Sequence, residues 1–323
     1  MTPLQFEAAH HALWDELEAA LATSSAPDPA RVAALYRATC EHLALARSRA
    51  YPVHLTGRLE SLAQRGHQRV YRRPGQGAQR LARLFLVDVP QSVRAHGAYV
   101  LVATLLFVLP LVVLGVMTYL DPGFVLAMHD AESVRQYDTM YGPSSGPIGR
   151  ERGADTDWAM FGFYIMNNVS IAFRCFASGL VLGLGSLFFV TYNGALAGTV
   201  AGYLTARGYG ETFYSFVVGH GAFELTAIVL AGAAGLALGH ALLAPGRLPR
   251  LQALKNAARD AVPLMTGVFA MLLVAAALEA FWSSSRWVVP QVKFIVGGGF
   301  WVLVLLYLFV QGRPRAGGAA GAG

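Results

Sequence analysis

The chain has 323 residues, of which 55% are hydrophobic and only 14% are charged. A soluble protein of this length would carry about 25% charged residues, and several apolar runs reach the roughly 20 residues that cross a bilayer, so we predict an all-α, polytopic membrane protein. The net charge of +6 is spread over the loops, which argues against nucleic-acid binding, and the distant Cys40 and Cys175 exclude a disulfide framework.

Residues 1–97 are predicted to be a cytoplasmic, amphipathic helical region. Apolar side chains recur at helical spacing from Phe6 to Leu21. Asp28 and Pro29 then give the N-cap and the first helical position of a second helix, which should end before Pro52. Two leucine-bearing stretches follow. We expect a small helical bundle that leads into the membrane.

The membrane part begins with a first span at residues 98–120. An acidic loop rich in Gly and Pro follows at 121–158, and a flexible tail closes the chain at 313–323. Between them, residues 159–312 are predicted to form a transmembrane helical bundle, whose apolar runs lie at 159–175, 177–204, 212–244, 262–282 and 292–311.

The distribution of basic residues predicts the topology. Twelve arginines precede the first span, the spacer at 245–260 is basic, and the loop at 121–157 carries seven acidic residues against three arginines. Since Lys and Arg are enriched in cytoplasmic loops, we expect both termini and the 245–260 loop in the cytoplasm. This topology requires residues 159–204 to cross the membrane twice, which gives about six spans in total. The alternative is five spans with 159–175 as a re-entrant or interfacial helix.

Small residues recur every fourth position in two of the runs. Such GxxxG-like faces allow close approach of helix backbones in a membrane. We predict that the two faces pack on each other within the chain, with a homo-oligomer interface as the alternative. The residues concerned are Gly194, Gly198, Gly202, Ala231, Gly235 and Gly239.

Several polar groups fall within the apolar runs, where a charge costs about 2.5–3.5 kcal/mol. His220 and Glu224 share one helical face. Three hypotheses stay open: a structural polar lock between spans, a proton or ion path, and a metal-dependent intramembrane hydrolase. The third is weak because "HGAFE" supplies at most two metal ligands where three are needed. We therefore predict no catalytic, cofactor or metal residue, and an intramembrane polar cluster of His220, Glu224, Glu279, Asn193 and Arg174.

Longer stretches resemble a known family. They read "LYRATCEHLALAR", "VPQSVR", "TYNGALAG", "GHGAFELTAIVLAGAAGLALG" and "LEAFWSSS" in this order. Together they resemble the stage II sporulation protein M family over nearly the whole chain. Their most specific parts are Asn193-Gly194, His220-Gly221, Glu224-Leu225 and Glu279-Ala280.

The resemblance implies a multi-pass protein of the bacterial cytoplasmic (inner) membrane. In spore-formers the family member works as a membrane scaffold with partners that degrade peptidoglycan. A non-enzymatic scaffold is therefore the expected function, with the lipid bilayer and other membrane or envelope proteins as partners and no nucleic acid. A transporter or channel that uses the His/Glu path is the alternative. The family offers no catalytic residues to carry over.

Overall fold

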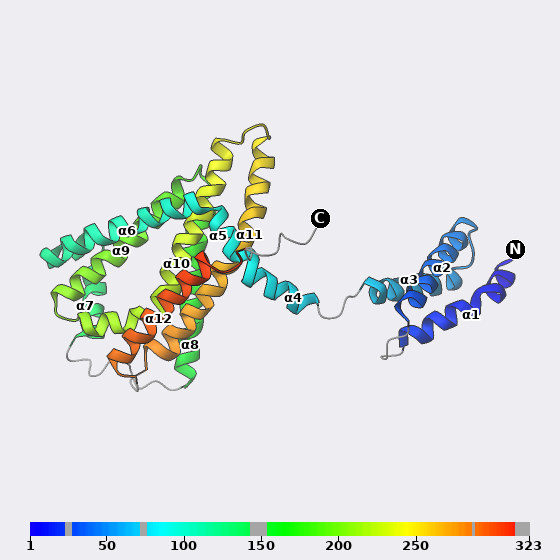
Figure 1. The fold of residues 1–323 in the computed structure, drawn as a ribbon, viewed down its shortest axis with the longest axis horizontal. Helices are drawn as coiled ribbons and strands as arrows, with labels where there is room; N and C mark the ends of the chain where they lie inside the picture. Colours follow the sequence, from blue (N-terminus) through cyan, green and yellow to red (C-terminus); the bar gives the residue numbers. More distant parts are fainter. Residues whose placement is uncertain (23–27, 72–75, 143–153, 286–287, 314–323) are drawn as a thin grey trace, which may run out of the picture. The chain divides into compact units, whose positions relative to one another are not determined.

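The structure is a computed structural model that describes residues 1–22, 28–71, 76–142, 154–285 and 288–313. Every regular element in these ranges is helical, as the sequence predicts (Figure 1). The chain divides into two compact units, Met1–Arg80 and Leu81–Gly323. The short helix α4 (Gln76–Arg83) contains the boundary between them.

The first unit is a bundle of α1 (Pro3–Ala22), α2 (Pro29–Ser48) and α3 (Val53–Tyr71). The predicted cap of α2 is confirmed, since Asp28 Oδ1 accepts the Ala30 N–H at 3.0 Å. The three helices bury apolar side chains that recur every three or four residues. These side chains are Phe6, Trp14, Leu17, Val32, Leu35, Ala46, Leu55, Leu59 and Leu62.

A histidine pair closes one part of this core. Trp14 is fully buried, and its indole N–H donates to His42 Nδ1 at 3.0 Å. His10 stacks on His42 with ring centroids 4.0 Å apart. Burial, followed by the charge of His10, lowers the pKa of His42. The neutral imidazole is therefore the form that this core favours.

The second unit, which we call the membrane unit, begins with η1 (Leu84–Asp88), a π-helical turn, and α5 (Val89–Ala95). Long helices then alternate with short elements. They are α6 (Gly97–Leu120), η2 (Pro122–Ala127), α7 (Ala131–Tyr141), α8 (Ala154–Ala177), η4 (Ser178–Leu180), α9 (Leu184–Ala206), α10 (Gly210–Leu243), α11 (Arg250–Ala277), η5 (Leu278–Ser283) and α12 (Pro290–Phe309).

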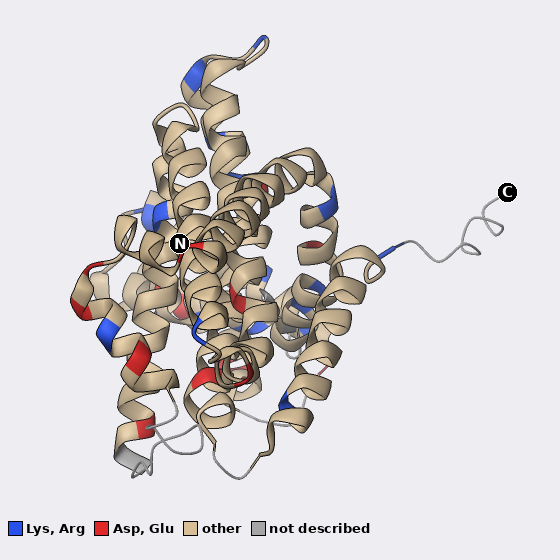
Figure 2. Ribbon diagram, turned by 90° about the vertical axis from the view of Figure 1, so that its left-hand side faces the viewer, with Lys and Arg blue, Asp and Glu red and all other residues tan. Residues whose placement is uncertain are grey.

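Five helices of the described residues are long and apolar enough to cross a membrane: α6, α9, α10, α11 continued by η5, and α12. Charged residues are sparse along the ribbon (Figure 2). The 24-residue α8, which contains the predicted run 159–175, is not among the five. Asn167, Asn168 and Arg174 lower its hydropathy.

The directions of the helices nevertheless require α8 to run the depth of the bundle. Gly194 of α9 lies on Phe107 of α6, and Gly202 lies on Gly115, so these two helices are parallel. The chain must return between them, and a 24-residue helix rises about 36 Å. Trp158, near the start of α8, contacts Phe281 just beyond α11. This geometry matches the prediction of about six crossings rather than the five-span alternative.

Helix α10 is the centre of the membrane unit (Figure 1). It contacts α6, α8, α9, α11 and α12. In the most apolar 18-residue stretch of α10, 61% of the residues are buried. The corresponding stretch of α6 is only 11% buried, and its outward side chains are exposed. The core of the unit therefore forms around α10, and most of the α6 surface is exposed.

Parts of the segments between the spans are helical where the sequence predicts loops. Residues 250–260, taken as part of a basic loop at 245–260, continue α11 as helix, because Arg, Lys, Gln and Ala favour helix. Within the acidic loop at 121–158, η2 and α7 begin at Asp121 and Asp130, whose carboxylates accept the N–H groups of Gly123 and Ser133. These caps explain why short helices form in a loop rich in Gly and Pro.

The two small-residue faces do not pack on each other, which corrects the prediction. Gly194, Gly198 and Gly202 lie instead on the backbone of α6. Gly235 meets the end of α8 and Ser186 in the first turn of α9, and Gly239 meets Gly183. Both small-residue faces therefore pack against other elements of the same chain.

Candidate functional site

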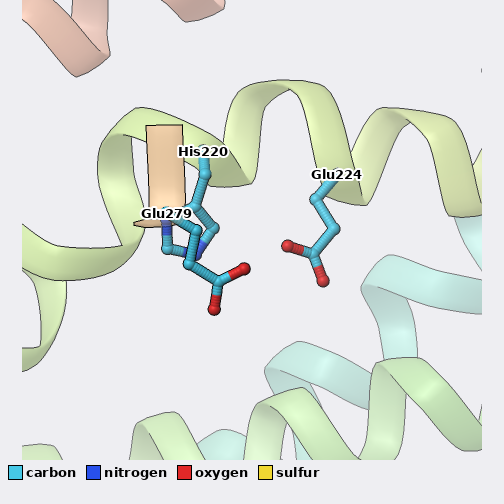
Figure 3. Close-up of side chains that lie close together, drawn as sticks. All are labelled: His220, Glu224 and Glu279. Carbon is cyan, nitrogen blue, oxygen red and sulfur yellow. The ribbon is translucent and has the colours of Figure 1, made fainter. Parts of the chain in front are cut away.

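Three ionisable side chains meet inside the membrane unit. His220 and Glu224 project from α10, and Glu279 projects from η5 toward the same point (Figure 3). A ligand atom of each lies within 4.8 Å of the other two. The i, i+4 spacing on α10 explains the first pair, and the antiparallel packing of α10 on α11 and η5 supplies the third group.

The His220 ring is held by its surroundings. The side chain is 5% exposed, and its Nδ1 lies 3.1 Å from Ser283 Oγ. Phe216, one turn earlier in α10, places its ring edge-to-face with the imidazole. With Nδ1 engaged by Ser283, Nε2 is the nitrogen left to face the two carboxylates.

The π-helical turn η5 determines which residues reach α10. It carries both Glu279 and Ser283, so one element supplies a cluster member and the hydrogen-bond partner of another. π-Helical turns inside α-helices are rare and are frequent at functional sites. The local widening of the helix is therefore consistent with a built site.

A buried cation and a tyrosine border the cluster. Lys293 of α12 is 2% exposed, and its Nζ donates to the Ser283 carbonyl at 2.8 Å. Tyr141 at the end of α7 is also buried, and burial, followed by the negative charge of Glu279, raises the pKa of its hydroxyl. A helix of the acidic loop thus reaches the site.

Two predicted members of the polar cluster lie elsewhere. Arg174 is exposed near the end of α8, where its carbonyl accepts the Ser178 hydroxyl. Asn193 donates to the Phe189 carbonyl of its own helix at 2.8 Å. Ser283, Lys293 and Tyr141 are site residues that were not predicted from the sequence. Only "LEAFWSSS", which holds Glu279 and Ser283 at helical spacing, carried a local signal.

The fold and this site define a class: an all-α, polytopic membrane protein with a buried polar centre between two of its helices. The family model of stage II sporulation protein M matches residues 100–284, more than half of the chain. The chain therefore belongs to this family, as its motifs indicate. A model for a domain of unknown function (DUF8413) matches residues 4–72, within the first unit. No curated protein and no solved structure matches the chain.

Proposed function

We propose that the chain is a non-enzymatic scaffold of the bacterial cytoplasmic membrane that assembles with envelope or peptidoglycan-remodelling proteins. The observation that carries this proposal is the division into two units, each with its own core. A helical unit with its own buried core suits the binding of a partner, while the membrane unit supplies the anchor.

The interior of the membrane unit favours a scaffold over a transporter. Two cavities among the described residues are lined almost entirely by apolar side chains: one lies between Phe176 and residues 258–269 of α11, the other between η1, α10, α11 and α12. Neither borders His220, Glu224 or Glu279. An ion path through these groups would need polar access to them.

The ends of the membrane unit support the proposed orientation. We call the end with the α10–α11 turn the basic end, and the end with α7 the acidic end. The first carries Arg247, Arg250, Lys255 and Arg259. The second carries Asp121, Asp130, Glu132 and Asp138. Because Lys and Arg are enriched in cytoplasmic loops, this distribution supports a cytoplasmic location for the basic end and for both termini.

Cysteine labelling tests the orientation. In a chain with Cys40→Ser and Cys175→Ala, we introduce Glu132→Cys in α7 or Arg247→Cys in the α10–α11 turn; Glu132 and Arg247 are charged residues outside the spans. An impermeant maleimide added to intact cells should label the first variant and reach the second only after permeabilisation. The reverse pattern would overturn the layout.

Co-purification tests the scaffold role. The full chain and a chain lacking residues 1–75 are captured from mild detergent and compared by quantitative mass spectrometry with an unrelated membrane protein. Specific envelope proteins should accompany the full chain, and at least one should depend on the first unit. Recovery of both chains without any enriched partner would refute the proposal.

A further inference from the structure

We propose that His220, Glu224 and Glu279 bind one divalent transition-metal ion, with zinc as the first choice, between α10 and η5. The motif "HGAFE" by itself holds only two metal ligands, too few for a zinc site. The structure brings the third, Glu279, to the same point from a different helix (Figure 3). An imidazole and two carboxylates are ordinary zinc ligands.

The spacing suits a small metal ion. The three ligand atoms lie within 4.8 Å of one another. Zinc binds imidazole nitrogen and carboxylate oxygen at about 2.0–2.2 Å, so ligand atoms around a tetrahedral ion lie roughly 3.3 Å apart. Both glutamates are flexible at their terminal torsions. Small side-chain rotations therefore close the distance without movement of either helix.

The groups around His220 are those that a metal-binding histidine needs. Such a histidine uses one ring nitrogen for the metal and donates the N–H of the other to a neighbouring acceptor. Here Ser283 Oγ lies 3.1 Å from Nδ1, so in the tautomer with Nδ1 protonated the Nδ1–H donates to Ser283 and Nε2 is left for the ion. Ser283 is 1% exposed and is fixed within the same turn as Glu279.

Charge favours the same occupant. Two glutamates inside an apolar bundle bring up to two negative charges to a place where an isolated charge is costly. A divalent cation matches that charge in a single ion. Lys293 has its ammonium directed to the Ser283 carbonyl. With ligands from both α10 and η5, the ion would link α10 to the end of α11. Its fourth coordination position would hold a water molecule.

Metal analysis of the purified full chain tests the proposal. The protein carries an affinity tag without histidine, is exposed to ZnSO4, and is freed of unbound ion by gel filtration. The native chain should retain about one zinc per chain. The variants His220→Asn and Glu279→Gln should retain almost none. Ser283→Ala should bind zinc about tenfold more weakly in a chelator competition, as expected when the partner of a ligating histidine is lost.

Two variants of α10 provide matched controls. His240→Asn and Glu211→Gln remove an imidazole and a carboxylate from the two ends of the same helix, away from the cluster. Both should keep the zinc of the native chain. Co²⁺ supplies a second readout, because its visible absorption reports tetrahedral coordination and should vanish in His220→Asn even if zinc adheres elsewhere.

Three results would overturn the proposal. The first is a native chain that stays free of zinc and cobalt after supplementation, as expected if Glu224 and Glu279 hold protons in place of a metal ion. The second is retention of the ion by the double variant His220→Asn, Glu279→Gln. The third is equal loss in the control variants. Gel-filtration profiles identify any variant that fails to fold, and Ser283→Ala then carries the comparison.

Discussion

Tyr203 of α9 donates its hydroxyl hydrogen to the carboxylate of Asp138 in α7, with oxygen–oxygen distances of 3.0 and 2.9 Å. This contact ties the acidic loop to the end of a membrane helix. Tyr203→Phe should remove about 1–2 kcal/mol of local stability, because a hydrogen bond to a charged acceptor is lost. Amide exchange in α7 should become roughly tenfold faster by mass spectrometry.

Tyr192→Phe is the matched control for this change. Tyr192 lies on the same helix, is 40% exposed and stacks on Phe188. Its substitution should leave exchange in α7 unchanged. Unchanged exchange in Tyr203→Phe as well would show that the apolar contacts of Tyr141 and Leu204, and not the hydrogen bond, hold the segment.

The parallel contact between α6 and α9 depends on Gly198. A Cβ at this position would lie under 3.0 Å from the backbone of Leu111, which cannot rotate away. Gly198→Leu should therefore destabilise the membrane unit by at least about 1–3 kcal/mol, the usual cost of overpacking. Thermal unfolding in detergent should show a lower midpoint.

Gly298 of α12 provides the comparison, because a Cβ there meets nothing within 4 Å. Gly298→Leu should unfold at or above the native midpoint, since replacing glycine within a helix is favourable by itself. An equal loss in both variants would mean that bulk at any membrane glycine is harmful and that the α6–α9 contact has no special role.

The first unit should weaken in acid because of His42. Its folded-state pKa lies below the ordinary value of 6.5, so the unfolded chain takes up a proton first. Stability is then complete above about pH 6.5 and falls as the pH drops below it toward the folded pKa. Amide exchange in α1 and α2 should rise between pH 7.5 and 5.5 after correction for intrinsic rates.

His42→Gln separates titration from packing. The glutamine carbonyl can still accept the Trp14 N–H, but the side chain does not titrate. The pH-dependent part of exchange in α1 should shrink in this variant, while His54→Gln, on the exposed face of α3, should retain it. If amide exchange in His42→Gln were as sensitive to acid as in the native chain, the role of His42 would be contradicted.

The two lysines of the chain should react very differently. Lys255 is exposed on α11, whereas Lys293 is 2% exposed. An amine-reactive ester applied to the folded protein in detergent should modify Lys255 and leave Lys293 unmodified. Denaturation before labelling should make both react. Modification of Lys293 in the folded protein at a rate near that of Lys255 would contradict the enclosed site.

Most of the architecture follows from local patterns. Apolar runs predicted the long helices, and the Asp28–Pro29 pair predicted the start of α2. The helical extension of α11 through 250–260 was missed because hydropathy marks where a helix leaves lipid, not where it ends. Charge asymmetry suggested an even number of crossings in 159–204, and the parallel α6–α9 contact gives this a geometric basis.

The candidate site was only partly visible in the sequence. His220 and Glu224 are four residues apart on one helix, so their proximity is a local property. Glu279 and Lys293 come from other helices, and their approach depends on how α11 and α12 pack on α10. The partner of the α9 glycine face was mistaken for the same reason: periodicity identifies a small-residue face but not the helix that covers it.

The pairing of α6 with α9 also has a consequence for biogenesis. Membrane helices insert individually before they associate. The helix that α6 contacts most, α9, is made only after the acidic loop and α8 have been synthesised. Until then the Gly115 face of α6 is without its partner helix, so we expect α6 to stay beside the insertion machinery. Ribosome-bound chains that end before Leu184 should therefore crosslink from α6 to the translocon, and longer chains should release it.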